Sequence, residues 1–305
     1  MMNRTHLDSV KLLLDVAPDV FREPVFALKG GTAINLFLRD MPRLSVDLDL
    51  VYTDHRHGRE EALAGIDSAL TSAGLELERR GFRCDRGTGG EETKLFVERE
   101  GVRIKIEVNH VFRGSVLPVT ARPLSDTAQD IFFTDIELPV LHADELYGSK
   151  LVAAMDRQHP RDLFDVLNLY TQGGGLSPGI AECVVCYLAG HNRPVHEVLF
   201  ANRVDIFQAY ANEFVGMPRE PVGLDELLAI REKLFADLPS ALSDPQREFL
   251  LGLVRGEPDW SLMSCAHLRE MPAIRWKLAN LDRLRESNPT KFASQESELL
   301  RRFES

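Results

Sequence analysis

The sequence has little cysteine and no long apolar run. Four cysteines in 305 residues are too few for a disulfide scaffold, and we therefore expect a cytoplasmic protein. No stretch is long and apolar enough to predict a membrane span. The N-terminal segment also lacks the small-residue cleavage site of a signal peptide. Cys183 and Cys186 have a CxxC spacing, but no second Cys/His pair follows closely, so we expect both to pack inside a helix.

An excess of positive charge is also missing. The chain has 36 basic and 47 acidic residues, a formal net charge of −11, which is not typical of a general nucleic-acid binder. Phosphate contact needs only a local basic patch. Two clusters are candidates, although each alone is more typical of a solvated surface. They are Arg79, Arg80, Arg83 and Arg86, and Arg275, Lys277, Arg283 and Arg285.

The chain contains no Rossmann fingerprint, no Ser-His-Asp pattern, no internal repeat and no low-complexity segment. What it does contain is a change of pattern near residue 140. Before that point, alternating and helical periodicities are mixed; after Pro139 the periodicity is helical. We therefore predict an α/β fold, with a small mixed-sheet domain at 1–140 and an α-helical domain at 141–305.

The periodicities also predict individual elements. Strands are expected at 25–28, 46–52, 93–100, 103–111 and 131–138. Helices are expected at 6–18, 31–39, 58–73, 142–156, 160–172 and 177–189. Shorter helices should follow, separated by Pro218, Pro221, Pro239, Pro245 and Pro258.

The most informative segment is KGGTAINLFLRDMPRLSVDLDLVY, residues 29–52. A glycine pair, Gly30 and Gly31, stands between a predicted strand and a predicted helix. The missing Cβ atoms allow a phosphate to approach the backbone amides at the helix N-terminus. A tight turn without a ligand is the alternative. Thr32 would either cap this helix or offer its hydroxyl to phosphate.

Polar side chains alternate along the following strand. Ser45, Asp47 and Asp49 share one face, because strand side chains repeat their direction every second residue. Two carboxylates at this spacing repel each other unless a positive group lies between them. Mg²⁺ or Mn²⁺, with nucleotide phosphates completing its shell, would supply that group; an exposed strand edge is the alternative. Arg43 would support the loop or a phosphate, and the whole segment predicts nucleotidyl transfer.

The run GGTAIN…RLSVDLDL resembles the first motif of the polymerase-beta-like nucleotidyltransferases. It is most similar to the branch of bacterial AbiEii/AbiGii toxins from abortive-infection and toxin–antitoxin systems. Further matching motifs are IKIEVN at 104–109, ELYGSKLVA at 145–153 and RDLFDVLNLY at 161–170. The resemblance covers residues 25–172. Four motifs in this order are specific for the family but not for the substrate.

The resemblance implies roles for further residues. Glu107 would be the third acidic residue, on a neighbouring strand, unless the Lys-Glu-Asn face there is simply solvated. Lys150 would contact nucleotide phosphates and would be oriented by Asp165, both contributing to an active-site cleft between the domains. Alternatively, Lys150 extends to the surface. Asp162 shares a face with Asp165 and also suits the helix N-terminus, so the functional aspartate stays open.

The resemblance also implies a reaction: an acceptor hydroxyl attacks the α-phosphorus of an NTP. The catalytic residues would be Asp47, Asp49, Glu107, Lys150 and Asp165, of which Asp47, Asp49 and Glu107 would bind the metal. The nucleotide would be held by Gly30, Gly31, Thr32, Arg43, Ser45 and Lys150.

The implied biology is the toxin of a toxin–antitoxin or phage-defence system. It transfers nucleotides, most often to a tRNA 3′ end, and is restrained by a separately encoded antitoxin. A protein hydroxyl or an aminoglycoside-type small molecule is an alternative acceptor. A non-catalytic nucleotide-binding module is the remaining alternative. The sequence specifies neither the nucleotide nor the acceptor.

Overall fold

The computed structural model describes residues 2–89 and 92–304, and the chain in it divides into two compact units. The first unit comprises Met1–Leu146 and Phe214–Pro221, and the second Tyr147–Glu213 and Val222–Ser305. The division falls within helix α5 (Ala143–Asp156). Over the described residues, no helix is long and apolar enough to cross a membrane.

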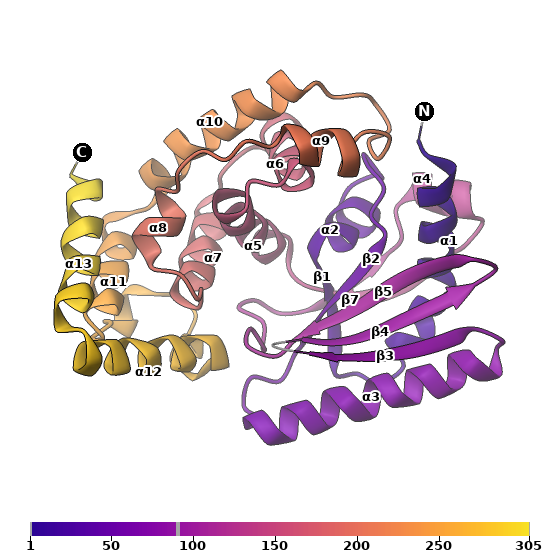
Figure 1. Cartoon of the computed structure of the whole chain (residues 1–305), viewed down its shortest axis with the longest axis horizontal. Helices are drawn as coiled ribbons and strands as arrows, with labels where there is room; N and C mark the ends of the chain where they lie inside the picture. The colour runs from indigo at the N-terminus through magenta and orange to yellow at the C-terminus, as the bar shows by residue number, and fades with distance from the viewer. Residues whose placement is uncertain (1, 90–91, 305) are drawn as a thin grey trace. The chain divides into compact units, whose positions relative to one another are not determined.

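The first unit is built on a seven-stranded mixed sheet with the strand order β3-β4-β5-β2-β1-β7-β6 (Figure 1). Strand β2 pairs in parallel with β5, and β1 in parallel with β7; the other neighbours are antiparallel. The strands are β1 (Phe26–Lys29), β2 (Asp47–Tyr52), β3 (Arg83–Gly89), β4 (Glu92–Arg99), β5 (Val102–Asn109), β6 (Thr120–Pro123) and β7 (Glu137–Val140).

Two long helices cover one face of this sheet. Helix α1 (Arg4–Val20) packs against β5, helix α3 (Arg59–Arg79) packs against β3 and β4, and the two helices contact each other. Leu48, Leu50 and Ile106 are fully buried, whereas the charged residues beside them in β2 and β5 are partly exposed: Asp47, Asp49, Lys105 and Glu107. Burial on one face only explains the alternating pattern of β2 and β5, and it leaves the polar face available for a site.

Shorter helical segments complete the first unit. They are α2 (Gly30–Thr32), a π-helical segment (Ala33–Leu38) and α4 (Asp126–Phe132). The π-helical segment begins one residue after the glycine pair; such segments occur frequently at functional sites.

The described part of the second unit is helical. Proline occupies the first turn of α6, α7, α11, α12 and α13. Its missing N–H costs nothing there, because N–H groups of the first turn have no partner within the helix. The helices after α5 are α6 (Pro160–Gln172), α7 (Pro178–Ala189), α8 (Val195–Leu199), α9 (Phe207–Glu213), α10 (Leu224–Ala241), α11 (Asp244–Val254), α12 (Pro272–Ser287) and α13 (Pro289–Phe303).

The predicted fold class, a mixed-sheet α/β part followed by helices, is confirmed, but some elements differ from prediction. The strand predicted at 131–138 is wrong, because α4 continues to Phe132 and β7 begins only at Glu137. Pro239 lies inside α10 instead of separating helices; the burial of Leu234 and Leu238 in the core continues this helix to its end. Cys183 and Cys186 are free and buried in α7, as predicted.

Candidate active site

The glycine pair sits where β1 turns into α2, tightly against β2. Gly30 has a φ of 73°, and a Cβ there would overlap the Asp49 carboxylate. A Cβ at Gly31 would lie 2.8 Å from Arg43 Nη2 and 2.9 Å from Ser45 Oγ. Side chains at either position would therefore displace the polar groups of β2 and the segment before it. The glycines are explained by this close approach and, at Gly30, by a left-handed backbone.

Buried polar side chains fix the turn from beneath. Thr32 is completely buried, and its hydroxyl donates to the Asp47 carbonyl oxygen at 2.6 Å. It does not cap the helix, so that interpretation was wrong. The Asn35 amide donates to the Gly31 carbonyl oxygen at 2.9 Å, and buried Arg43 donates to the Leu44 carbonyl oxygen at 2.9 Å. These bonds support the loop role predicted for Arg43 and make direct phosphate contact by the Thr32 hydroxyl unfavourable in this conformation.

Sequence reasoning missed Asn35. The signal was present, because Asn35 is the polar residue in the apolar run AINLFL. A fully buried amide needs a hydrogen-bond partner, and a nearby turn is a common source of one.

The strand register aligns charged residues across the sheet. Asp49 lies opposite Lys29 of β1 and Glu107 of β5, and Glu107 lies opposite Lys94 of β4. Two residues earlier on the same two strands, Asp47 lies opposite Lys105. Directly opposed residues project from the same face, so the acidic residues predicted for the site do share one face of neighbouring strands.

Lysines occupy this face as well as carboxylates. Glu107 forms ion pairs with Lys94 at 2.8 Å and with Lys105 at 2.9 Å. Lys105 Nζ also lies 4.0 Å from Asp47 Oδ1. Burial raises the pKa of Glu107, but hydrogen bonds from Lys94 and Lys105 outweigh it and lower that pKa. At Lys105, burial lowers the pKa, but the hydrogen bond to Glu107 and the charge of Asp47 raise it by more.

Lys105 corrects one step of the sequence argument. The carboxylates were expected to need a cation, and in this structure the Lys105 ammonium supplies positive charge beside Asp47 and Glu107. Its position two residues before Glu107 on one strand was the signal that sequence reasoning did not use.

The residues fit a divalent cation only in part. No cluster of at least three His, Cys, Asp or Glu side chains that would hold a metal occurs in the described residues. Asp47 and Asp49 offer partly exposed carboxylate oxygens, which suit a hard cation whose other ligands come from a nucleotide. Glu107 has both oxygens engaged by lysines, so its predicted metal role requires those lysines to move.

The second unit holds a separate, buried charge cluster. Lys150 on α5 pairs with Asp162 at 2.7 Å and with Asp165 at 3.1 Å, both on α6. Arg157 pairs with Asp162 at 2.6 Å. Burial raises the pKa of Asp162, but the charges of Lys150 and Arg157 lower it by more. The predicted Lys150–Asp165 pair is present, and Asp162 binds the same ammonium.

Burial also decides between the two interpretations of Lys150 made from sequence. Lys150, Asp162 and Asp165 are all buried, so the extension of Lys150 to the surface is wrong. A phosphate-binding role for Lys150 stays a prediction.

Neither basic cluster forms a set of free cations. In the first, each arginine has an acidic partner: Arg79 with Glu76, Arg80 with Asp19, Arg83 with Asp85 and Arg86 with Asp67.

In the second cluster, Lys277 is buried and donates to the carbonyl oxygens of His191 and Arg193 at 3.0 and 2.7 Å. The predicted patch is therefore wrong for Lys277, because this side chain points into the core of the unit.

Comparison with known proteins agrees with the geometry. The family model for "Nucleotidyl transferase AbiEii toxin, Type IV TA system" matches residues 11–280. A solved structure, MenT4, nucleotidyltransferase toxin Rv2826c from Mycobacterium tuberculosis H37Rv, is similar in fold, with a TM-score of 0.59 and 20% sequence identity. The match covers 91% of this chain and 94% of that one. No curated protein sequence matches.

The chain belongs to the AbiEii family of nucleotidyltransferase toxins of type IV toxin–antitoxin systems. It is accordingly a nucleotidyltransferase with an NTP substrate, and the family implies an antitoxin partner.

Proposed function

We propose that this AbiEii-family enzyme uses Mg²⁺ or Mn²⁺ to transfer a nucleotide from an NTP to the 3′-terminal hydroxyl of a tRNA in the cytoplasm. The observation that carries the proposal is the close approach of Gly30 to Asp49, whose carboxylate would overlap a Cβ at Gly30. A phosphate bound to the backbone amides of the glycine turn lies directly beside the carboxylates, so nucleotide and cation share one site.

The residues of the chain divide into those that bind and those that position. Asp47 and Asp49 hold the cation, which when bound neutralises phosphate charge. Gly30 and Gly31 present backbone amides to the triphosphate, and Ser45, whose Oγ lies beside Gly31, donates its hydroxyl to the same phosphates. Thr32 and Arg43 act by holding the turn.

Charged side chains on β4 and β5 prepare the site for the nucleotide. Lys94 and Lys105 keep Glu107 ionised, since they lower its pKa. When the anionic nucleotide binds, Lys105 exchanges its carboxylate partners for phosphate oxygens. This exchange frees one oxygen of Glu107, while Lys94 keeps the other; the freed oxygen would either join the metal shell or accept the proton of the attacking hydroxyl. In the second unit, Lys150 is the proposed phosphate-binding lysine, with Asp162 and Asp165 fixing its ammonium.

The test is nucleotide labelling in a total cell extract. The purified chain is incubated with each α-labelled NTP, with Mg²⁺ or with EDTA, and the product is treated with RNase or protease. We expect label that requires Mg²⁺ and disappears with RNase. Label only in protease-sensitive material would replace the tRNA acceptor with a protein hydroxyl, and equal labelling in EDTA would exclude the metal role.

Growth measurements extend this test to the cell. Induced expression of the chain should arrest bacterial growth, and phage infection should be restricted if the toxin acts in defence. The Asp49→Asn variant should do neither at the same protein level. Arrest by both proteins would show that toxicity does not depend on the proposed site.

A further inference from the structure

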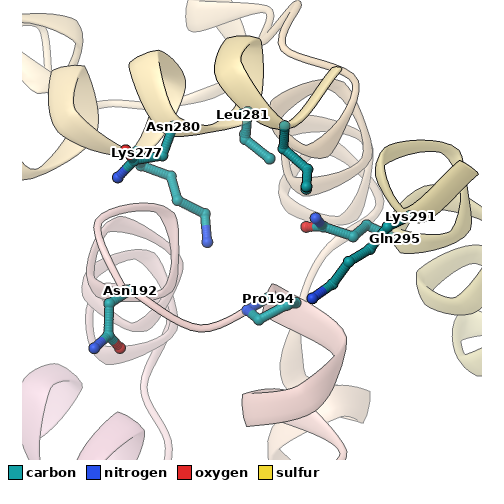
Figure 2. A pocket seen from close by; sticks show the side chains of 8 residues that line it. Asn192, Pro194, Lys277, Asn280, Leu281, Lys291 and Gln295 are labelled. Atoms are coloured by element: carbon teal, nitrogen blue, oxygen red, sulfur yellow. The ribbon is translucent and has the colours of Figure 1, made fainter. Parts of the chain in front are cut away.

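A pocket of about 180 Å³ lies within the second unit, between α12, α13 and the loop before α8. Figure 2 shows Lys277, Lys291 and Gln295 directed toward this one hollow. Asn192, Asn280 and Leu281 complete the part of the wall that matters here. A benzene-sized ligand needs about 150 Å³, so the pocket accommodates one compact group.

The Lys277 ammonium is buried without a carboxylate partner. Its two hydrogen bonds go to the carbonyl oxygens of His191 and Arg193, which leaves one of its three N–H groups without an acceptor. Among the described residues, neither Lys277 nor Lys291 forms an ion pair with an acidic side chain. Burial lowers the pKa of Lys277 to about 8, and the charge of Glu197 offsets only part of this effect.

Gln295 supplies an independent indication of an occupant. This side chain is buried to more than nine-tenths, and its Oε1 has no hydrogen-bond partner. Buried amides are normally satisfied, and the unpaired Oε1, an acceptor, needs a donor, so an anion fits here only with the amide turned over. The terminal torsion of glutamine is broad, and a half-turn would present Nε2 as a donor toward the pocket.

We propose that this pocket binds one phosphate group, either as a free ion or as a phosphomonoester. The two ammonium groups reach the pocket from separate segments, Lys277 from α12 and Lys291 from α13 (Figure 2). Oxygens of a tetrahedral anion point in several directions and match such a wall, whereas a planar carboxylate uses only one side. Two ammonium groups provide the charge that a phosphate needs. None of the residues proposed for nucleotide transfer lines this pocket.

The loop that carries the pocket wall is held in place. Arg193 forms ion pairs with Asp156 and with Glu197. The His191 and Arg193 carbonyl oxygens therefore keep a fixed position beneath Lys277, and the anion site is preformed.

The experiment is calorimetric titration of the full chain in EDTA with inorganic phosphate, ribose 5-phosphate and acetate. We expect saturable binding of the phosphates and none of acetate at the same concentration. Lys291→Ala should weaken phosphate binding about tenfold, and Lys277→Met combined with Lys291→Ala should abolish it. Tighter binding of ribose 5-phosphate than of inorganic phosphate would identify a monoester as the source.

Arg275→Ala is the matched control, because it removes a positive charge from an exposed position of α12 outside the pocket. It should bind phosphate as the unchanged chain does. Lys291 is exposed, so its substitution tests the proposal even if the Lys277 variant fails to fold. Absence of saturable phosphate binding, undiminished binding by the double variant, or equal binding of acetate would each overturn the proposal.

Discussion

The β2–β5 face and the α5–α6 pair both combine acidic and basic side chains, but they differ in exposure. On the sheet, Asp47, Lys105 and Glu107 leave 32, 34 and 16% of their side chains exposed. On the helices, Lys150, Asp162 and Asp165 are buried. Hydrated ion pairs contribute little to stability and exchange partners easily, whereas a buried pair leaves an uncompensated charge when one partner is lost. The sheet face is therefore suited to ligand exchange and the helical cluster to rigid support.

The largest expected effect is loss of transfer on the sheet face. Asp49→Asn preserves shape but removes a carboxylate proposed to bind the cation, so we expect transfer to fall by at least about 100-fold. The midpoint of urea unfolding should change little. Asp85→Asn on β3 is the control, since this partly exposed aspartate belongs to the same sheet but not to the site. Comparable transfer by the two variants would contradict the assignment.

In the buried cluster of α5 and α6, we expect a substitution to lower stability. Asp162→Asn removes the carboxylate shared by Lys150 and Arg157, and the free energy of unfolding should decrease by about 3–5 kcal/mol. Asp282→Asn on α12 is the control: this exposed aspartate pairs only loosely with Arg285, and its loss should change stability by less than about 1 kcal/mol. Urea titrations measure both. Equal small effects would show that the helical cluster is not more tightly coupled than surface pairs.

Two glycines with the same backbone conformation allow the effect of a steric clash to be measured apart from that of backbone strain. Gly30 and Gly101 have φ values of 73° and 78°, but only at Gly30 would a Cβ meet other atoms, those of Asp49. Gly30→Ala should therefore lower stability by about 1–3 kcal/mol more than Gly101→Ala. It should also weaken nucleotide binding, because the turn amides and Asp49 must move apart. Identical losses in the two variants would show that backbone strain alone explains Gly30.

Much of the fold could be predicted because the patterns in the sequence reflect one-sided burial. The alternation in β5 and the helical spacing in α6 each follow directly from a single buried face. Strand β3 (RCDRGTG) has no such pattern; it is a strand because its full length pairs with β4. Backbone pairing with a distant segment leaves no periodic signal in the segment itself.

The candidate site was predictable in position but not in its electrostatics. The glycine pair, Asp47 and Asp49 could be placed together, because strand geometry fixes their faces. That Lys105 reaches Asp47 depends on the parallel register of β2 and β5, which no local pattern specifies. The burial of Lys277 was missed for a similar reason: its partners are backbone carbonyl oxygens more than eighty residues away in the chain.

The smallest expected effect tests whether Lys105 competes with the cation. Its ammonium lies 4.0 Å from Asp47 Oδ1, where it repels a metal ion approaching the same carboxylate. Lys105→Met should therefore strengthen nucleotide-free Mn²⁺ binding by about two- to fivefold, a change below 1 kcal/mol that befits a partly hydrated pair. Lys94→Met is the matched control, because Lys94 pairs with Glu92 and Glu107 but not with Asp47, and its effect should be smaller. Mn²⁺ titration followed by electron paramagnetic resonance measures both affinities. Unchanged or weaker Mn²⁺ binding by Lys105→Met would mean that Lys105 does not compete for the carboxylates, and the exchange of partners proposed for nucleotide binding would lose its basis.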